Sequence, residues 1–385
     1  MTTSPHSRSL AGTSPLERVE DTGLRYLPPV PLKKDCRIGI LGSGFIVDEC
    51  HLVSYRRAGF NPVGIASRNR ENAARVAGRH MIPRVYDNYD QLLDDPRIEI
   101  LDIAVPPNRQ LDLIRAACAR GTVKGILAQK PLALNYVDAA QAVCCCEAAG
   151  IVLSVNQNMR YDPTVYTAKM LLKQDFFGAP VFATIDMRGI PHWKPWQFET
   201  GSATLKVMSI HHLDCMRYWF GEPERLFCST RSDPRTKFPH TDGICTTILE
   251  YANDLRCVVI DDVWTGPAEE GCPGDIRIEW RIEGLDGLAI GDIGWCQDPY
   301  TTPSTMRYAR EGDEGFRYFK PIESWFPDAF SATMGQLLIA IETDHIPAVS
   351  GRDNLKTIAL VEAAVLSAIE HRTVRPEEIV MTSAQ

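Results

Sequence analysis

The chain has 385 residues, of which 44% are hydrophobic and 23% charged, and this length favours two domains over one. Lys and Arg number 41 against 49 Asp and Glu, so the net charge of −8 disfavours general binding to nucleic acids or to anionic membranes. No apolar run reaches the about 18 residues that a membrane span needs, and the polar segment 1–35 lacks the apolar centre of a signal peptide. We therefore expect a soluble, cytoplasmic protein with a flexible arm over residues 1–35.

The cysteines form no recognisable metal or disulfide pattern. The twelve of them include no Cys-x-x-Cys pair and no Cys/His set at the spacing of a zinc site. Cys144, Cys145 and Cys146 are consecutive within a helical pattern, and successive side chains on a helix point about 100° apart. Three thiols arranged in this way cannot share one ion, so we expect reduced, mostly structural cysteines and no metal site.

Hydrophobic periodicity predicts a first domain over residues 36–158. Short apolar runs rich in Ile, Val and Leu alternate there with stretches of helical spacing. Such short connections favour a doubly wound α/β domain, whose parallel sheet is covered on both faces. The predicted strands are Arg37–Leu41, Pro62–Ser67, Glu99–Val105, Gly125–Gln129 and Ile151–Val155, and the predicted helices are Glu49–Ala58, Glu71–His80, Gln110–Arg120 and Val137–Ala149.

A different rhythm predicts a second, α+β domain over residues 159–373, followed by a short tail over 374–385. Longer strand-like runs are separated by the turn sequences Asn253-Asp254 and Asp286-Gly287, which favours a mainly antiparallel sheet with helices on one side. The predicted strands are Val181–Met187, Leu226–Arg231, Gly243–Tyr251, Leu255–Trp264 and Ile276–Glu283, and the predicted helices are Ile210–Phe220 and Asn354–Arg372.

The strongest local motif follows the first predicted strand. In CRIGILGSGFIVDECHL, Gly42 and Gly44 make a tight turn, and a helix begins near Phe45 and Ile46. Glycines at such a turn let the backbone approach a pyrophosphate, which then lies at the positive N-terminus of the helix. Val47 replaces the last glycine of the dinucleotide-binding fingerprint, and we expect it to loosen helix–strand packing without abolishing binding.

The residues after the second predicted strand bear on the choice between NAD and NADP. An acidic residue there binds the ribose 2′-hydroxyl of NAD and repels the 2′-phosphate of NADP. Ser67 is neutral, and Arg68 and Arg70 are cations, so either cofactor is compatible with the sequence. The alternative is that both arginines simply begin a solvated helix.

A lysine–proline pair follows the strand Gly125–Gln129. The carboxyl ends of parallel strands line the ligand crevice of a doubly wound sheet, and Pro131 restricts the backbone at Lys130. Composition alone leaves open that Lys130 is an ordinary surface residue.

Four segments together resemble the Gfo/Idh/MocA family, the relatives of glucose–fructose oxidoreductase and inositol dehydrogenase. They are GILGSGFI, ILAQKPLA, NQNMRYDP and SIHHLDCMRYWFG, and they occur in family order within residues 36–379. The resemblance implies an N-terminal Rossmann domain, a C-terminal domain with an open-faced sheet, and a nicotinamide cofactor (NAD or NADP) between them. It also implies a carbohydrate or polyol substrate and a homo-oligomer, a dimer or tetramer assembled through that sheet.

The family's catalytic motifs match unevenly. Its Glu-Lys-Pro is Gln129-Lys130-Pro131 here, so the lysine matches and the acid does not. Its catalytic histidine matches His211, but the aspartate that it places four residues earlier is Val207. The resemblance implies Lys130 and His211 as the catalytic pair.

Further candidates surround this pair. Asn158 and Arg160 lie in the segment that usually enters the substrate crevice in the family, and His192 and Trp193 lie in a Pro-bounded loop after a strand. The candidate substrate-binding residues are Asn158, Arg160, His192, Trp193, His212 and Asp214. The candidate cofactor-binding residues are Gly42, Gly44, Phe45, Ile46, Ser67, Arg68, Pro106, Asn108, Gln129 and Lys130.

Hydride transfer from a carbinol carbon needs a base for the hydroxyl proton and a donor for the developing oxyanion. His211 can act as the base and Lys130 as the donor, and burial of Lys130 without an acidic neighbour would lower its pKa. Adjacent helix residues point about 100° apart, so His211 and His212 should differ in role. Asp214 could orient His211, and His212 is expected to pack or to make a supporting hydrogen bond.

We therefore expect an NAD(P)-dependent oxidoreductase that acts on a sugar, a cyclic polyol or a sugar glycoside. One alternative is a redox-neutral enzyme of the same family, which oxidises a glycoside transiently, eliminates the aglycone and reduces the product. Another is a non-catalytic sugar sensor that binds the cofactor, which the absence of an aspartate at position 207 would fit.

Overall fold

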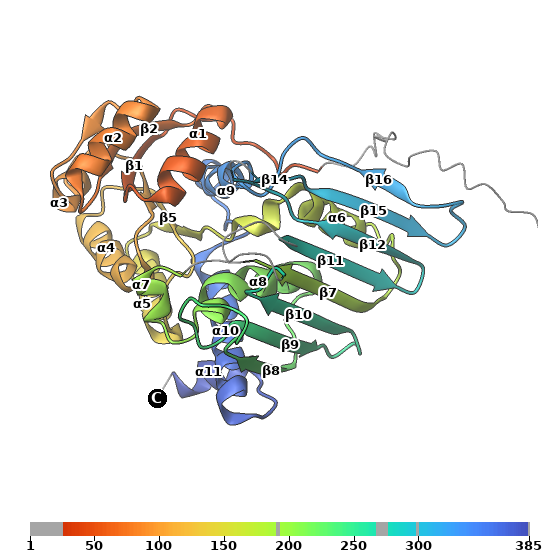
Figure 1. Ribbon diagram of the computed structural model, residues 1–385. Coiled ribbons are helices and arrows are strands. Elements are labelled where there is room, and N and C mark those ends of the chain that lie inside the picture. The colour runs from red at the N-terminus through yellow and green to blue at the C-terminus, as the bar shows by residue number, and fades with distance from the viewer. Residues whose placement is uncertain (1–25, 190–192, 267–275, 298–299, 384–385) are drawn as a thin grey trace, which may run out of the picture.

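The computed structural model describes residues 26–189, 193–266, 276–297 and 300–383. The first part folds around a six-stranded parallel sheet in the order β3-β2-β1-β4-β5-β6, which confirms the predicted doubly wound architecture (Figure 1). The order reverses between β1 and β4, and ligands bind at such switch points beyond the carboxyl ends of the strands. The strands are β1 Arg37–Leu41, β2 Asn61–Ala66, β3 Arg84–Val85, β4 Ile100–Ile103, β5 Gly125–Ala128 and β6 Val152–Val155.

Helices cover both faces of this sheet. Three of them begin at an asparagine whose side chain accepts a backbone N–H of the first turn, namely Asn69, Asn88 and Asn135. The helices are α1 Leu52–Ala58, α2 Arg70–His80, α3 Tyr89–Leu93, α4 Pro107–Arg120 and α5 Tyr136–Ala148. Short elements β3 and α3 were not predicted, because too few apolar residues repeat within them.

A π-helix, Ile46–His51, replaces the regular helix start that we expected after the glycine turn. Val47 lies within it, is 1% exposed and belongs to the same core cluster as Ile38 and Ile40 of β1. The expected loosening at Val47 is therefore not seen, because the wider π turn accommodates the valine side chain against the strand.

The second part forms an eight-stranded sheet in the order β16-β15-β12-β11-β7-β10-β9-β8. Neighbouring strands are antiparallel except β7 and β10, and both predicted turn sequences join antiparallel neighbours. The strands are β7 Pro180–Arg188, β8 Arg225–Arg231, β9 Ile244–Glu250, β10 Arg256–Asp262, β11 Arg277–Gly284, β12 Gly287–Asp292, β15 Thr305–Arg310 and β16 Arg317–Phe319. A small separate ribbon pairs β13 Trp295–Gln297 with β14 Tyr300–Thr302.

The long helices of the second part pack on one face of this sheet and leave the other face open (Figure 1). Along β9, Cys245, Thr247 and Leu249 are buried, whereas the alternate residue Ile248 is 39% exposed. The helices are α6 Pro163–Lys173, α8 Ile210–Phe220 and α10 Gly351–Glu370, with the single-turn α7 Pro195–Phe198 in a connection. The predicted mainly antiparallel sheet with helices on one side is confirmed.

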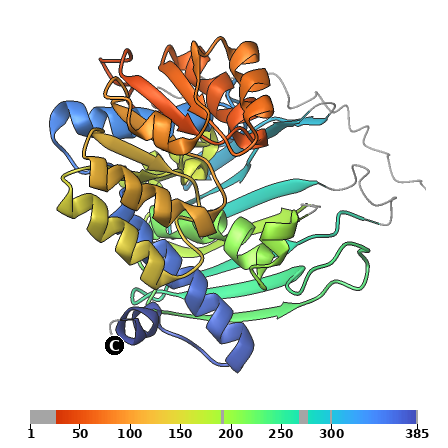
Figure 2. The ribbon, with the colours of Figure 1, turned by 90° about the vertical axis from the view of Figure 1, so that its left-hand side faces the viewer.

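Two C-terminal features differ from the sequence-based division of the chain. Helix α9, Ala329–Thr343, lies against the first domain, where Leu337 and Leu338 join the core cluster of β1 (Figures 1 and 2). The expected tail is ordered: Val374 is buried, exchanges two backbone hydrogen bonds with Leu226 of β8 and leads into α11, Pro376–Thr382. Long-range packing of this kind leaves no local signal in the sequence.

Within the described residues, no helix is long and apolar enough to cross a membrane.

Candidate active site

The glycine turn after β1 leaves room at the start of a helix. Gly42 has φ +123°, and a Cβ there would come within 2.4 Å of the carbonyl oxygen of Ala104, so only glycine fits. A Cβ at Gly44 would meet no atom within 4 Å, and the neighbouring Phe45 is 47% exposed. Open space before backbone N–H groups at a helix start suits a diphosphate, so these residues fit a dinucleotide.

The end of β2 faces the same turn. Ser43 donates a hydrogen bond from its hydroxyl to Ser67 Oγ at 2.9 Å, which ties the two loops together. Arg70 pairs with Asp87 at 2.6 Å, whereas Arg68 is exposed and forms no ion pair with any residue that the structure describes. Among the two expected cations, Arg68 is therefore the one free to meet a ligand.

The segment around Lys130 is tied to the start of α4. Pro106 and Asn108 are exposed beside the first turn of α4, and Gln110 is fully buried one turn later. The side-chain amide of Gln110 donates to the carbonyl oxygens of Gln129 and Pro131, each at 2.8 Å. The backbone on both sides of Lys130 is thereby fixed at the carboxyl edge of the parallel sheet.

Lys130 contacts the residue that replaces the family's aspartate. Its Nζ donates to the backbone carbonyl oxygen of Val207 at 2.6 Å. Val207 lies in a second π-helix, Thr204–Ser209, which passes directly into α8. A change from π to α hydrogen bonding can leave a carbonyl without a helical partner, and π turns often occur at functional sites. Burial lowers the pKa of Lys130 to about 7.

His211 lies close to Lys130 at the start of α8. Its side chain is 3% exposed, its Nδ1 has no hydrogen-bond partner within the described chain, and the Trp325 ring packs edge-on against it at 5.1 Å between centroids. Burial, followed by the charge of Lys130, holds the pKa of His211 well below its usual range. A neutral imidazole beside an amine of near-neutral pKa can exchange protons with a hydroxyl group.

His212 has a different environment from that of His211. It is fully buried, and its Nδ1 lies 2.7 Å from Asp261 Oδ1 in β10. Asp261 also accepts the hydroxyl of Ser209 at 2.5 Å. This hydrogen bond fits the supporting role that the sequence suggested for His212.

Two residues expected to bind substrate are paired with each other instead. Arg160 and Asp214 form a bidentate ion pair with two distances of 2.6 Å, and both are at least 95% buried. Two residues of α10 complete the network: Asp353 forms a second ion pair with Arg160, and the hydroxyl of Thr357 donates a hydrogen bond to Asp214. Asp214 therefore does not orient His211: its oxygens are used by a buried structural network that holds α8 to α10.

Asn158 is used to place an aromatic side chain. Its Oδ1 accepts the indole N–H of Trp325 at 2.7 Å, and Trp325 in turn packs on His211. The structure thus links Asn158 to His211 through Trp325. Trp193 is half-buried, and its enclosed indole N–H has no hydrogen-bond partner among the residues that the structure describes. His192 lies outside those residues.

Sequence reasoning missed a buried polar cluster behind Gln129. His51, at the end of the first π-helix, lies 2.6 Å from Asp102 in the middle of β4 and 2.9 Å from Asn156 after β6. An aspartate within the apolar run of a strand that is buried on both faces was the available signal for this cluster. Trp325 offered no comparable signal, since its contact with His211 joins segments more than a hundred residues apart.

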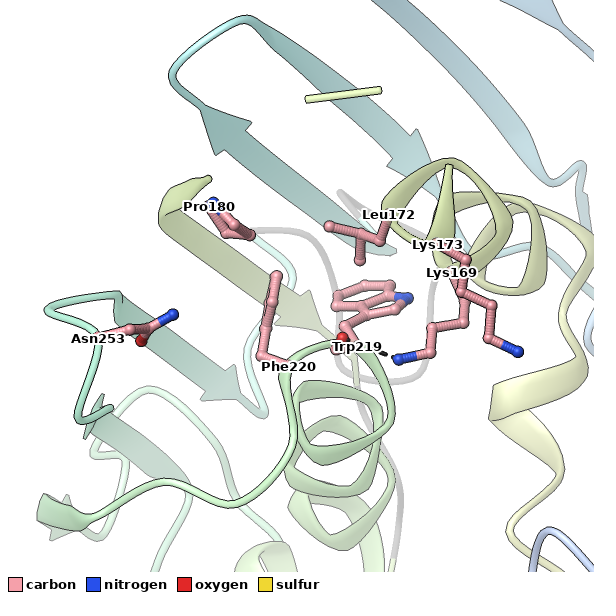
Figure 3. A pocket seen from close by; sticks show the side chains of 7 residues that line it. All are labelled: Lys169, Leu172, Lys173, Pro180, Trp219, Phe220 and Asn253. Carbon is pink, nitrogen blue, oxygen red and sulfur yellow. Dashed lines mark hydrogen bonds between the residues drawn. The ribbon is translucent and has the colours of Figure 1, made fainter. Parts of the chain in front are cut away.

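A separate cavity lies on the second domain, between α6 and the end of α8 (Figure 3). Its volume is about 220 Å³, and within it Lys169 donates to the carbonyl oxygen of Trp219 at 3.0 Å. It contains no histidine or carboxylate, so it lacks the acid–base pair found at Lys130 and His211. The lining residues are Lys169, Leu172, Lys173, Pro180, Trp219, Phe220 and Asn253.

No group of three or more metal-ligating side chains comes together within the part of the chain that the structure describes.

Family models match both parts of the chain. The model described as an oxidoreductase family with an NAD-binding Rossmann fold matches residues 36–157, and the GFO/IDH/MocA C-terminal domain matches residues 165–294. These ranges contain the glycine turn, Lys130 and His211.

Similar proteins include several sugar and polyol dehydrogenases. A D-apiose dehydrogenase of Paraburkholderia graminis is 26% identical over 87% of this chain and 88% of its own length. A myo-inositol 2-dehydrogenase of Thermotoga maritima is 25% identical over 89% of this chain and 99% of its own length. Among solved structures, a levoglucosan dehydrogenase in complex with NADH and L-sorbose shares the fold, with a TM-score of 0.76 at 21% identity over 89% of this chain and 99% of that one.

Proposed function

Because the chain belongs to the Gfo/Idh/MocA family of oxidoreductases with an NAD-binding Rossmann fold, we propose that it transfers hydride between a nicotinamide cofactor and a carbinol carbon of a sugar, cyclic polyol or sugar glycoside. One observation carries this proposal: at the carboxyl edge of the parallel sheet, Lys130 hydrogen-bonds to Val207 and lies close enough to His211 for its charge to help lower the pKa of the imidazole. The sugar and polyol dehydrogenases among its relatives support the substrate class.

The proposed mechanism assigns one proton task to each side chain. A bound nicotinamide would supply the hydride acceptor for the substrate carbon. The neutral imidazole of His211 takes the hydroxyl proton, and Lys130 Nζ donates a hydrogen bond to the same oxygen as its negative charge develops. The carbonyl of Val207 holds the ammonium in place before substrate arrives. Trp325 keeps the imidazole ring in one orientation and excludes water from that side.

Either NAD or NADP fits the residues at the end of β2. Gly42, Gly44, Phe45 and Ile46 would hold the diphosphate, while Pro106, Asn108 and Gln129 border the crevice beyond β4 and β5. The absence of an acidic residue at Ser67 and the free cation at Arg68 support tolerance of a 2′-phosphate.

We further propose that two or more copies assemble through the open sheet face. Phe227, Ile248 and Val258 lie directly opposite one another on β8, β9 and β10, and the first two are 37% and 39% exposed. A row of outward apolar side chains on one sheet face suits a second apolar surface. Light scattering on the wild type and on Ile248→Asp tests the assembly, and a monomeric wild type would refute it.

All cysteines whose side chains the structure places are free thiols, which supports a reducing, cytoplasmic compartment.

The experiment for the central proposal screens sugars, polyols and glycosides with NAD and NADP, and measures reduced cofactor and released aglycone together. The proposal predicts net formation of NADH or NADPH with at least one sugar or polyol. Aglycone release without net reduced cofactor would instead support the redox-neutral alternative. Cofactor and sugar binding with no turnover in either direction would support the sensor.

A further inference from the structure

A buried chain of hydrogen bonds runs from the middle of β4 to the backbone of Lys130. Asp102 is fully buried, and its Oδ2 lies 2.6 Å from His51 Nδ1. On the far side of the ring, His51 Nε2 lies 3.3 Å from Gln129 Nε2. The other amide atom, Gln129 Oε1, accepts the backbone N–H of Lys130 at 2.8 Å.

The direction of every hydrogen bond in this chain follows from one contact. The backbone N–H of Lys130 can only donate, so the oxygen end of the Gln129 amide must face it and the NH₂ end must face His51. His51 Nε2 is then an acceptor, and the NH₂ group of Asn156 donates to the same nitrogen at 2.9 Å. The ring proton of His51 therefore lies on Nδ1 and is donated to Asp102 Oδ2.

Position 129 explains why such a chain is useful here. A carboxylate offers an acceptor at both ends, whereas an amide has one acceptor end and one donor end. If the Gln129 amide turned over, its NH₂ group would meet the N–H of Lys130, and two donors would face each other. The N–H of Lys130 at one end and the acceptor nitrogen of His51 at the other together hold the amide in one orientation.

We propose that Asp102 and His51 are positioning residues for Lys130: Asp102 fixes the tautomer of His51, His51 fixes the amide of Gln129, and Gln129 holds the backbone of Lys130. The inference rests on the role proposed above for Lys130, but the proton position on His51 can be measured without any catalysis. Tyr55 also donates to Asp102 Oδ2, at 2.9 Å, and does not touch Gln129.

The first test is Asp102→Asn, which keeps the shape and reverses the hydrogen bond. The new amide would present its NH₂ group to His51 Nδ1 and to the hydroxyl of Tyr55, which can also accept, and the ring proton would move to Nε2. There it would face the NH₂ group of Gln129, whose other end is held by the N–H of Lys130. We expect kcat to fall about 10- to 100-fold, the usual effect of losing an outer hydrogen-bond partner of a functional group. Tyr55→Phe is the matched control, because it removes a buried hydrogen bond from the same carboxylate without changing the tautomer, so kcat should be retained.

The second test is a suppressor that a purely structural role would not produce. In Asp102→Asn/Gln129→Glu, a carboxylate at 129 accepts both the Nε2–H of His51 and the N–H of Lys130. The hydroxyl of Thr333 can donate or accept, so the Asn156 amide that it contacts can turn over. We expect the double variant to recover most of the kcat lost in Asp102→Asn. An unchanged kcat in Asp102→Asn, or no recovery in the double variant, would overturn the proposal.

A third measurement needs no turnover and is made on the wild-type protein. ¹⁵N NMR of histidine-labelled, cofactor-free protein, with the His51 signals identified by their loss in His51→Gln, should show the neutral Nδ1–H tautomer. An Nε2–H tautomer or an imidazolium at neutral pH would overturn the proposal. If the tautomer is as stated and Lys130→Met turns over normally, the assignment of Lys130 fails while the geometry of the chain stands.

Discussion

The Nζ of Lys130 lies 2.6 Å from the carbonyl oxygen of Val207, four residues before His211. Position 207 is where the family's pattern has an aspartate, and here its backbone offers Lys130 a carbonyl dipole in place of a negative charge. A dipole stabilises the ammonium less than a full negative charge does, so burial dominates and lowers the pKa of Lys130 to about 7. The absence of an acid at position 129 acts in the same direction.

The pH dependence of sugar oxidation should reflect these two groups. The base, His211, must be neutral, and its pKa is held well below its usual range, so it is in the right form at neutral pH. The donor, Lys130, must be charged, and its charge is lost as the pH rises through about 7. We therefore expect kcat/KM for oxidation to decrease above about pH 7, with the pH dependence of a single group that loses its proton.

The control for this prediction is Lys130→Arg, since a guanidinium stays charged throughout the range. Its lower residual activity should lack the alkaline decrease. A wild-type kcat/KM that rises between pH 7 and pH 9 would contradict the assignment of Lys130 as the charged donor.

His211 and His212 should be unequal on substitution. His211→Ala should remove most of kcat while cofactor binding and stability are retained. His212→Ala leaves the buried Asp261 without one of its partners, so we expect a loss of about 1–3 kcal/mol in the free energy of unfolding. Urea unfolding measures the loss of stability, and single-turnover kinetics measures the loss of hydride transfer. If hydride transfer falls more in His212→Ala than in His211→Ala, His212 and not His211 is the base.

Cofactor preference should depend on Arg68. If its free guanidinium meets a 2′-phosphate, Arg68→Ala should weaken NADP(H) binding by about 1.5–3 kcal/mol and leave NAD(H) nearly unaffected. Arg70→Ala is the matched control, because Arg70 is paired with Asp87. Isothermal titration with both cofactors tests this prediction, and equal losses in Arg68→Ala and Arg70→Ala would mark both arginines as ordinary helix-start residues.

Asp214 should prove to be structural. Asp214→Asn removes the charge that compensates the buried Arg160, and breaking such a pair costs about 3–5 kcal/mol. Asp353 still faces Arg160, so the loss should lie at the lower end of that range. A raised KM for substrate without lower stability would return Asp214 to the substrate site.

The features that the sequence predicted well depend on local pattern. The run Arg37–Leu41 and the turn at Gly42 combine strand propensity with a conformation that only glycine adopts, and the helix Ile210–Phe220 has clear apolar spacing. Lys130 and His211 are candidates because they match motifs of the family, and each lies at the end of a predicted element, after β5 and at the start of α8.

The features that were missed depend on contacts between distant segments. The pairing of Arg160 with Asp214 joins residues 54 apart, and α9 packs on a sheet formed some 200 residues earlier. The carbonyl of Val207 that accepts from Lys130 belongs to a π-helix, and no residue pattern in the sequence predicts a π-helix there. Asp102 was missed as well, although a carboxylate within an apolar strand is itself a signal of a buried polar partner.

The most direct test of the account is single-turnover hydride transfer in Lys130→Met, at saturating cofactor and with a sugar or polyol that the wild type turns over. The variant removes the ammonium and keeps most of the length of the side chain, so the account predicts that the rate falls by about 10²-fold or more, the usual loss for one oxyanion donor. The melting temperature should not decrease, because the charge that is removed was already costly to bury. A rate close to that of the wild type, in a variant that still binds cofactor and substrate, would contradict the assignment of this site.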